Sequence, residues 1–279
     1  YYTFIYYILV IKYEIKLFYV FGKIMKIFDC FPFFNEISLL DMRLNYLKEI
    51  VDKFVIVEGT HSHQGKIKKL YYDENKSLFK KYENKIIHII QDSYPKHLGD
   101  THSNFIFDYH TRNGINKGLR KCFDNDIILI SDVDEFPDIN KFSLFNGNLT
   151  IFKQLMFYFK FNLRVKNFNH DNGDGLWPGT RMLSFKLFKN MLNVQKVRNI
   201  KAKKYAWWRI DKPKLNIISY GGWHFRFIGT ANELKNELEN RAIGRGENIL
   251  SSYNEIDINN IIENQLPFTT KEERYEIYP

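Results

Sequence analysis

One stretch of the chain constrains its fold more than any other: residues 126–137, which read DIILISDVDEFP. Ile127–Ile130 is an uninterrupted apolar run of strand-forming residues, a pattern typical of a strand buried on both faces. Three acids, Asp132, Asp134 and Glu135, follow almost at once, and the proline at the end of the stretch removes a backbone donor. The stretch therefore predicts a central strand of a parallel sheet that ends in an acidic edge.

Asp132 and Asp134 are the first candidates for a metal site. They are two residues apart, so in extended backbone their carboxylates leave the same face of the chain. Two such carboxylates repel each other unless a positive group lies between them, and a divalent cation with open positions for phosphate oxygens suits this. The alternative is an acidic turn after a strand, because D-x-D is a common tripeptide.

Further apolar runs upstream predict an α/β fold. Residues 25–28, 54–57 and 86–90 read as short buried strands, with a helix over 38–51 and another over 103–122. A strand, a helix and a strand in this length form a right-handed parallel unit. We expect a mainly parallel central sheet flanked by helices.

The carboxyl ends of these strands predict where a ligand binds. Ligands of open parallel sheets bind beyond the carboxyl ends of the strands. Residues 29–36, Glu58 and the acids 132–135 follow such ends, so we expect Phe31, Glu36, Glu58 and Asp132 to contact a bound nucleotide.

The second half of the chain adds a loop, a basic cluster and a histidine. Residues 169–181 are rich in glycine and aspartate and predict turns, and five Lys and Arg residues lie within 196–204. A strand is expected before Gly221 and Gly222, which permit close approach of backbone or ligand next to His224. His224 is a candidate metal ligand or phosphate contact, and a buried structural histidine is the alternative.

Composition bears on partners and compartment. The formal net charge of +9 favours anionic partners, whether nucleotides, nucleic acid or acidic membrane surfaces. Cys30 and Cys122 form no disulfide framework, which favours a reducing compartment, and we expect a cytoplasmic protein. We expect three segments: a lead at 1–24 outside the fold and capable of weak membrane association, one domain at 25–250, and a polar C-terminal tail at 251–279.

Several ordered blocks between about residues 26 and 225 resemble glycosyltransferase family 17, in its shorter bacterial and viral form. They are MKIFDCF, LDMRLNYL, VDKFVIVE, ISDVDEFP, WPGT, RNIKAKKY and GGWHF. The resemblance implies a GT-A-like nucleotide-diphospho-sugar transferase fold. It also implies inverting transfer of a sugar, with N-acetylglucosamine expected, from a UDP-sugar to a glycan or glycoprotein acceptor with Mn²⁺ or a similar cation. Asp132 and Asp134 match the D-x-D metal motif of the family, and no specific nucleic acid is expected as a partner.

Two positions depart from the family pattern. The family usually has a glutamate where this chain has Asp108, four residues before Arg112, and an H-x-E block appears here as residues 245–247, RGE. Both departures concern the acceptor side of the reaction.

The chemistry of sugar transfer assigns further roles. A departing diphosphate gains negative charge, which a cation on Asp132 and Asp134, together with Arg112 or the basic cluster at 196–204, would stabilise. A carboxylate must also take the proton of the acceptor hydroxyl. Glu135, Asp171 and Asp174 are candidates, and we favour Asp174 because glycine-rich loops can close over a bound donor.

Other classes of function compete with sugar transfer. A metal-dependent phosphodiesterase or nuclease also uses clustered acids, but the histidines of this chain are scattered. A nucleic-acid-binding module would fit the positive charge, although the sequence shows no recognition motif. A carbohydrate-binding protein without catalysis would have no need of the D-x-D motif.

Overall fold

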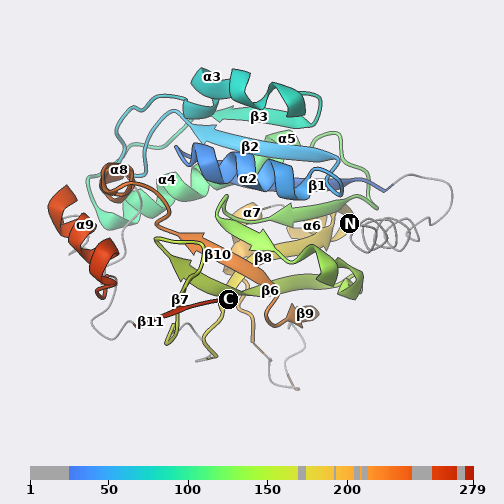
Figure 1. The fold of residues 1–279 in the computed structure, drawn as a ribbon. Coiled ribbons are helices and arrows are strands. Elements are labelled where there is room, and N and C mark those ends of the chain that lie inside the picture. The colour runs from blue at the N-terminus through green and yellow to red at the C-terminus, as the bar shows by residue number, and fades with distance from the viewer. Residues whose placement is uncertain are drawn as a thin grey trace.

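The computed structural model describes residues 25–168, 174–191, 193–203, 208, 213–240, 253–268 and 274–279. The expected lead at 1–24 lies outside these residues. The described residues form a mixed sheet with helices on both faces (Figure 1). Within this part of the chain, no helix is both long enough and apolar enough to cross a bilayer.

The first half of the sheet is entirely parallel, as predicted. Its neighbouring strands, in spatial order, are β4 (Ile127–Ile130), β1 (Ile27–Phe33), β2 (Lys53–Gly59) and β3 (Ile86–Gln91). All of β4 is buried, and so are most residues of β1 and β2. The continuous apolar runs in the sequence therefore reflect strands that are covered on both faces.

Two layers of helices provide that cover (Figure 1). On one face lie α2 (Ile37–Leu47), α3 (Tyr71–Asn75) and the 3₁₀ helix η1 (Lys76–Tyr82), whose apolar side chains share a core with β1, β2 and β4. On the other face lie α5 (Ile115–Gly118), α6 (Phe185–Met191) and α7 (Val194–Asn199).

The helix expected over residues 103–122 is divided in the structure. It forms α4 (Thr101–Asn113) and α5, with Gly114 between them. Gly118 lies directly against the Val55 side chain of β2, where a Cβ would collide with it. The glycines that weaken this helix thus allow it to approach the sheet closely.

The second half of the sheet is mixed and is centred on the long strand β6 (Leu149–Tyr158). β6 pairs with its neighbours in both orientations: antiparallel with β7 (Leu163–Val165) and β8 (Trp177–Ser184), and parallel with β9 (Leu215–Ile218) and β10 (Gly222–Arg226). β8 joins the halves by pairing with β4, and the short strand β5 (Glu135–Pro137) pairs with β10 before the 3₁₀ helix η2 (Ile139–Leu144). The predicted α/β class, a mixed and mostly parallel sheet with flanking helices, is confirmed.

The start of β8 differs from the sequence prediction. The sequence predicts turns over residues 177–181, whereas these residues form the first part of β8. Pro178 is accommodated where the register of β6 shifts between Ile151 and Lys153, and Gly179 lies against the Gln154 side chain. A local irregularity of the partner strand thus admits a proline and a glycine that would otherwise disrupt a strand.

The described part of the expected C-terminal tail is integrated into the fold. α9 (Glu255–Asn264) begins with a capping box between Asn254 and Asp257 and lies beside α8 (Ala231–Asn240) (Figure 1). Ile258 and Phe268 are buried in the same apolar cluster as Leu238 of α8. β11 (Tyr275–Ile277) pairs antiparallel with β7. The apolar side chains of α9 and Phe268 thus pack in the same core as those of α8.

A buried ion pair connects α2 to the acidic edge of the sheet. Arg43 of α2 is fully buried and binds both carboxylate oxygens of Asp29, with N–O distances of 2.7 Å. The same guanidinium donates to the backbone carbonyls of Asp132, Val133 and Glu135, at 3.2, 3.3 and 2.7 Å. Arg43 therefore fixes the backbone path of the loop that follows β4.

We expect Arg43→Ala to destabilise the protein by about 3–5 kcal/mol, because it leaves the Asp29 carboxylate buried without its partner. Urea unfolding followed by circular dichroism measures the change. Asp41→Ala is the matched control on the same helix, since the ion pair of Asp41 with Lys81 is exposed and should contribute little. Equal losses in the two variants would contradict this assignment.

Candidate active site

A cavity of about 460 Å³ lies at the carboxyl ends of β1, β2 and β4, the edge at which the sequence predicts a ligand. Its residues from these strand ends and the loops that follow them are Pro32, Phe33, Phe34, Glu36, Gly59, His61, Ser62, His63, Lys68, Asp132, Val133 and Asp134. Helix α4 adds Phe105, Asp108, Thr111 and Arg112. The first half of the fold thus supplies one wall of the site.

The second wall comes from the other half of the fold. Its residues are Trp177 from β8, His224 and Arg226 from β10, and Glu237 and Asn240 from α8. The backbone carbonyl of Asn240 accepts a hydrogen bond from the His63 amide at 3.0 Å. The end of α8 is therefore fastened to the loop after β2.

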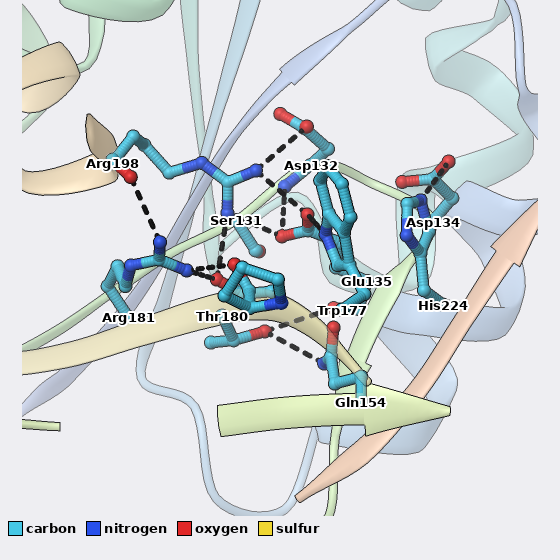
Figure 2. Close-up of polar contacts among 12 residues, drawn as sticks. Ser131, Asp132, Asp134, Glu135, Gln154, Trp177, Thr180, Arg181, Arg198 and His224 are labelled. Atoms are coloured by element: carbon cyan, nitrogen blue, oxygen red, sulfur yellow. Dashed lines mark hydrogen bonds and ion pairs between the residues drawn. The ribbon is translucent and has the colours of Figure 1, made fainter. Parts of the chain in front are cut away.

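Asp132 lies between two arginines. Its Oδ1 is 2.9 Å from Arg112 Nη2, and its Oδ2 is 3.1 Å from Arg198 Nη2 (Figure 2 shows the second contact). Burial by itself would raise the pKa of Asp132, but the charges of Arg112 and Arg198 outweigh it and lower the pKa to about 2. Asp132 is therefore a stable anion at neutral pH, with its charge already compensated by protein groups.

Asp134 lies beside His224, with Asp134 Oδ2 3.1 Å from His224 Nε2 (Figure 2). The backbone places them together, because the amide of Phe225 donates to the Asp134 carbonyl at 2.9 Å. Asp134 Oδ1 and His224 Nδ1 are buried and have no hydrogen-bond partner among the described residues.

These orphaned atoms provide a test of whether the site suits a divalent cation. A carboxylate oxygen and an imidazole nitrogen, both buried and lacking a donor or acceptor, are a donor set that such a cation accepts. Asp132, two residues away on the same loop, offers further carboxylate oxygens. The residues therefore fit a cation, although no cluster of three His, Cys, Asp or Glu side chains is already arranged to hold one within the described chain.

Glu135 lies beneath the cavity. It is fully buried and binds Arg198 through both carboxylate oxygens, at 2.7 and 2.8 Å. It also accepts hydrogen bonds from the Trp177 indole at 2.6 Å and from the Asp132 amide at 3.1 Å (Figure 2). The structure therefore does not support the predicted role of Glu135 as the base, because both oxygens are engaged and away from the cavity. Its contacts instead orient Trp177 and Asp132.

Arg112 is held from two sides at the wall formed by α4. Its Nη2 is 3.0 Å from Asp108 Oδ1, one helical turn earlier, as well as near Asp132. His63 Nε2 lies 3.7 Å from the same Asp108 oxygen, and burial lowers the pKa of His63. Asp108, at the position where the family pattern has glutamate, thus still provides a carboxylate that contacts Arg112.

Two predicted donor contacts, Phe31 and Glu58, lie in the core instead. Phe31 is fully buried beneath Arg43, whose guanidinium carbon is 4.8 Å from the ring centroid. Glu58 is fully buried and accepts hydrogen bonds from the Tyr72 and Asp73 amides at the start of α3, at 3.0 and 3.4 Å. Both residues shape the cavity from behind, and neighbouring residues such as Phe34 and Gly59 line it.

Asp174 is not among the residues that line the cavity. Its carboxylate pairs with the Lys153 ammonium and accepts a hydrogen bond from the Leu176 amide at 3.3 Å. Leu176 packs with Trp223 and Phe225, whereas the alternate β10 residues His224 and Arg226 line the cavity. The structure therefore does not bring the favoured candidate base to the site. The third candidate, Asp171, lies outside the described residues.

Two glutamates, Glu36 and Glu237, line the cavity from different elements. Burial raises the pKa of Glu36 to about 7, although hydrogen bonds from backbone amides, including those of Phe34 and Asn35, oppose the shift. Burial and the charge of Glu36 raise the pKa of Glu237 to about 8. Sequence reasoning predicted Glu36 but missed Glu237, Lys68, Trp177 and Arg226. The sequence feature that could have indicated Glu237 is its position between Leu234 and Leu238, which are both buried in α8.

Comparisons with known proteins identify the family. The model of glycosyltransferase family 17 matches residues 16–173. The chain belongs to glycosyltransferase family 17. The resemblance expected from the sequence blocks is thereby confirmed.

Individual relatives are more distant. Over 108 residues, the chain is 27% identical to human β-1,4-mannosyl-glycoprotein 4-β-N-acetylglucosaminyltransferase, a match that covers 37% of this chain and 20% of the human protein. Among solved structures it is similar to galactosyltransferase LgtC (TM-score 0.31, 11% identity, 64% of this chain and 67% of that one). It is also similar to glucosyl-3-phosphoglycerate synthase from Mycobacterium tuberculosis (TM-score 0.34, 11% identity, 91% and 87%).

The shifted pKa of Glu36 predicts a pH-dependent stability. The pKa of Glu36 is about 7 in the folded protein against 4.5 as its ordinary value, so the stability it contributes is present below about pH 4.5. That contribution is lost as the pH rises to about 7. Glu36→Gln keeps an oxygen for the Phe34 and Asn35 amides but does not titrate, so the wild type should lose stability relative to this variant across that window.

Urea unfolding at a series of pH values measures this difference. Glu83→Gln, an exposed glutamate after η1, is the control and should follow the wild type at every pH. A constant difference between wild type and Glu36→Gln from pH 4.5 to 7 would contradict the pKa shift of Glu36.

Proposed function

We propose that the chain transfers a sugar, N-acetylglucosamine in our assignment, from a UDP-sugar to a hydroxyl of a glycan or glycoprotein, with inversion and with Mn²⁺ or a similar cation. The observation that carries this proposal is the Asp134–His224 pair with its orphaned buried atoms, located in a cavity at the carboxyl edge of the sheet. Membership in family 17 supports sugar transfer, and similarity to an N-acetylglucosaminyltransferase supports the choice of sugar.

The cavity contains the charges that a diphosphate needs. Arg112, Arg226 and Lys68 all line it, and arginine binds phosphate oxygens through paired N–H donors. Arg112 is positioned by Asp108, so its guanidinium is already oriented before a ligand binds. We assign Arg112 to the diphosphate and Phe34 and Glu36, at the end of β1, to the nucleoside side of the donor.

Asp134 and His224 would hold the cation, with Asp132 beside them. The cation supplies charge that stabilises the departing diphosphate. For Asp132 the approach of a cation competes with Arg112 and Arg198, which already neutralise its carboxylate. We therefore assign the larger share of cation binding to Asp134 and His224.

A test measures UDP release by the purified chain from a panel of UDP-sugars in the presence of Mn²⁺. We expect the highest rate with UDP-N-acetylglucosamine and a loss of about 100-fold or more in Asp134→Asn. Asp124→Asn is the control, because Asp124 forms an exposed ion pair with Lys189 far from the cavity lining. Equal rates in Asp134→Asn and the wild type would refute the proposed site.

The role of His224 predicts a change in metal preference. An imidazole ligand suits Mn²⁺ better than Mg²⁺, so His224→Ala should weaken Mn²⁺ binding roughly 10- to 100-fold and narrow the preference for Mn²⁺. Titration calorimetry with each metal measures this, and His102→Ala, an exposed histidine of α4, is the control. If Mn²⁺ affinity stays unchanged in His224→Ala, the histidine only positions Asp134.

A further inference from the structure

The proposed transfer needs a carboxylate that takes the acceptor proton, and two of the three residues predicted for that task, Glu135 and Asp174, do not line the cavity. Glu135 is buried beneath it, and Asp174 pairs with Lys153 outside its lining. We propose that Glu237 of α8 is the catalytic base. This inference rests on the proposed function and assigns its proton acceptor.

The position of Glu237 is set by two anchors on its helix. Leu234 and Leu238 are both 1% exposed and bury one side of α8 in the apolar cluster shared with α9. The end of the helix is fixed by the Asn240 carbonyl, which accepts from the His63 amide. Between these anchors, Glu237 lines the cavity from the wall opposite the strand ends.

The other carboxylates that line the cavity belong to the opposite wall. Asp132 and Asp108 contact Arg112, Asp134 contacts His224, and Glu36 accepts amide hydrogen bonds of its own loop. In a direct displacement the acceptor must approach from the side away from the leaving group. Glu237 is the described lining carboxylate that comes from α8 rather than from the strand ends or α4.

The electrostatic surroundings of Glu237 suit a base. Burial and the negative charges of Glu36 and Asp134 raise the pKa of Glu237, whereas the positive charge of Arg226 opposes them. The result, about 8, lies close to neutral pH, where a general base combines a useful ionised fraction with a strong affinity for the proton.

The step balances as a single displacement. The Glu237 carboxylate accepts the proton of the acceptor hydroxyl while the hydroxyl oxygen forms a bond to the anomeric carbon. The bond between that carbon and the β-phosphate oxygen breaks, and its electron pair leaves with UDP. Glu237 ends protonated and returns its proton to solvent.

The test compares Glu237→Gln with Glu239→Gln, an exposed glutamate two residues along the same helix. UDP binding is measured by calorimetry with Mn²⁺, and UDP release from UDP-N-acetylglucosamine is measured with water or glycan as acceptor. We expect Glu237→Gln to bind UDP within about threefold of the wild type but to lose about 10²- to 10⁴-fold in kcat. Glu239→Gln should match the wild type in both measurements.

Two readouts separate a base from a residue that only supports the fold. The rate of the wild type should rise with pH as Glu237 ionises, and this rise should be absent in Glu237→Gln. Azide attacks the anomeric carbon without releasing a proton, so azide should restore UDP release and yield a glycosyl azide in Glu237→Ala but not in Asp134→Asn.

The outcomes also separate this inference from the proposed function. If the wild type neither binds UDP nor releases it from any UDP-sugar, the proposed function itself fails. If the wild type is active and Glu237→Gln retains its kcat, or loses it without rescue by azide in Glu237→Ala, Glu237 is not the base. Loss of the pH-dependent rise in Glu36→Gln instead would assign the role to Glu36.

Discussion

The site depends on one buried arginine. Arg43 neutralises Asp29 inside the core and donates to the backbone carbonyls of Asp132, Val133 and Glu135 after β4. A loop that carries Asp132, Asp134 and Glu135 would otherwise be spread by the repulsion of its own charges. Because the guanidinium is enclosed between the Phe31 and Phe136 rings, its geometry is rigid, and so is the position of each acid.

A second arginine determines where those acids lie. Arg198 binds both oxygens of Glu135 and one oxygen of Asp132, which places Glu135 in the interior and leaves Asp134 to the cavity. Glu135 in turn holds the Trp177 indole in the cavity wall. The three acids thus have different roles, which depend on the side chain that contacts each. Glu135 supports the wall, Asp132 is paired with arginines, and Asp134, beside His224, is the candidate metal ligand.

The two walls of the cavity have different origins. The strand ends of β1, β2 and β4 form the first wall together with α4, and a backbone hydrogen bond from His63 to Asn240 joins the loop after β2 to α8. The proposed base lies on the second wall, which also carries His224, whereas Asp132 and Asp134 lie on the first. The acids of the loop after β4 contact Arg112, Arg198 and His224, and the proposed base comes from a different element.

The sequence by itself determined the parallel strands, because continuous apolar runs such as Ile127–Ile130 require cover on both faces, and it placed Asp134 and Glu36 at the ligand edge. Only the tertiary structure decided which acids face the cavity. Glu135 is buried by Arg198, 63 residues away, and Glu58 by the amides at the start of α3. A sequence pattern does not reveal such partners, because the strength of a buried charge contact depends on distance in space and the partners are far apart in the chain. For the same reason Glu237, in an ordinary charged helix, acquires its environment only when α8 docks on the loop after β2.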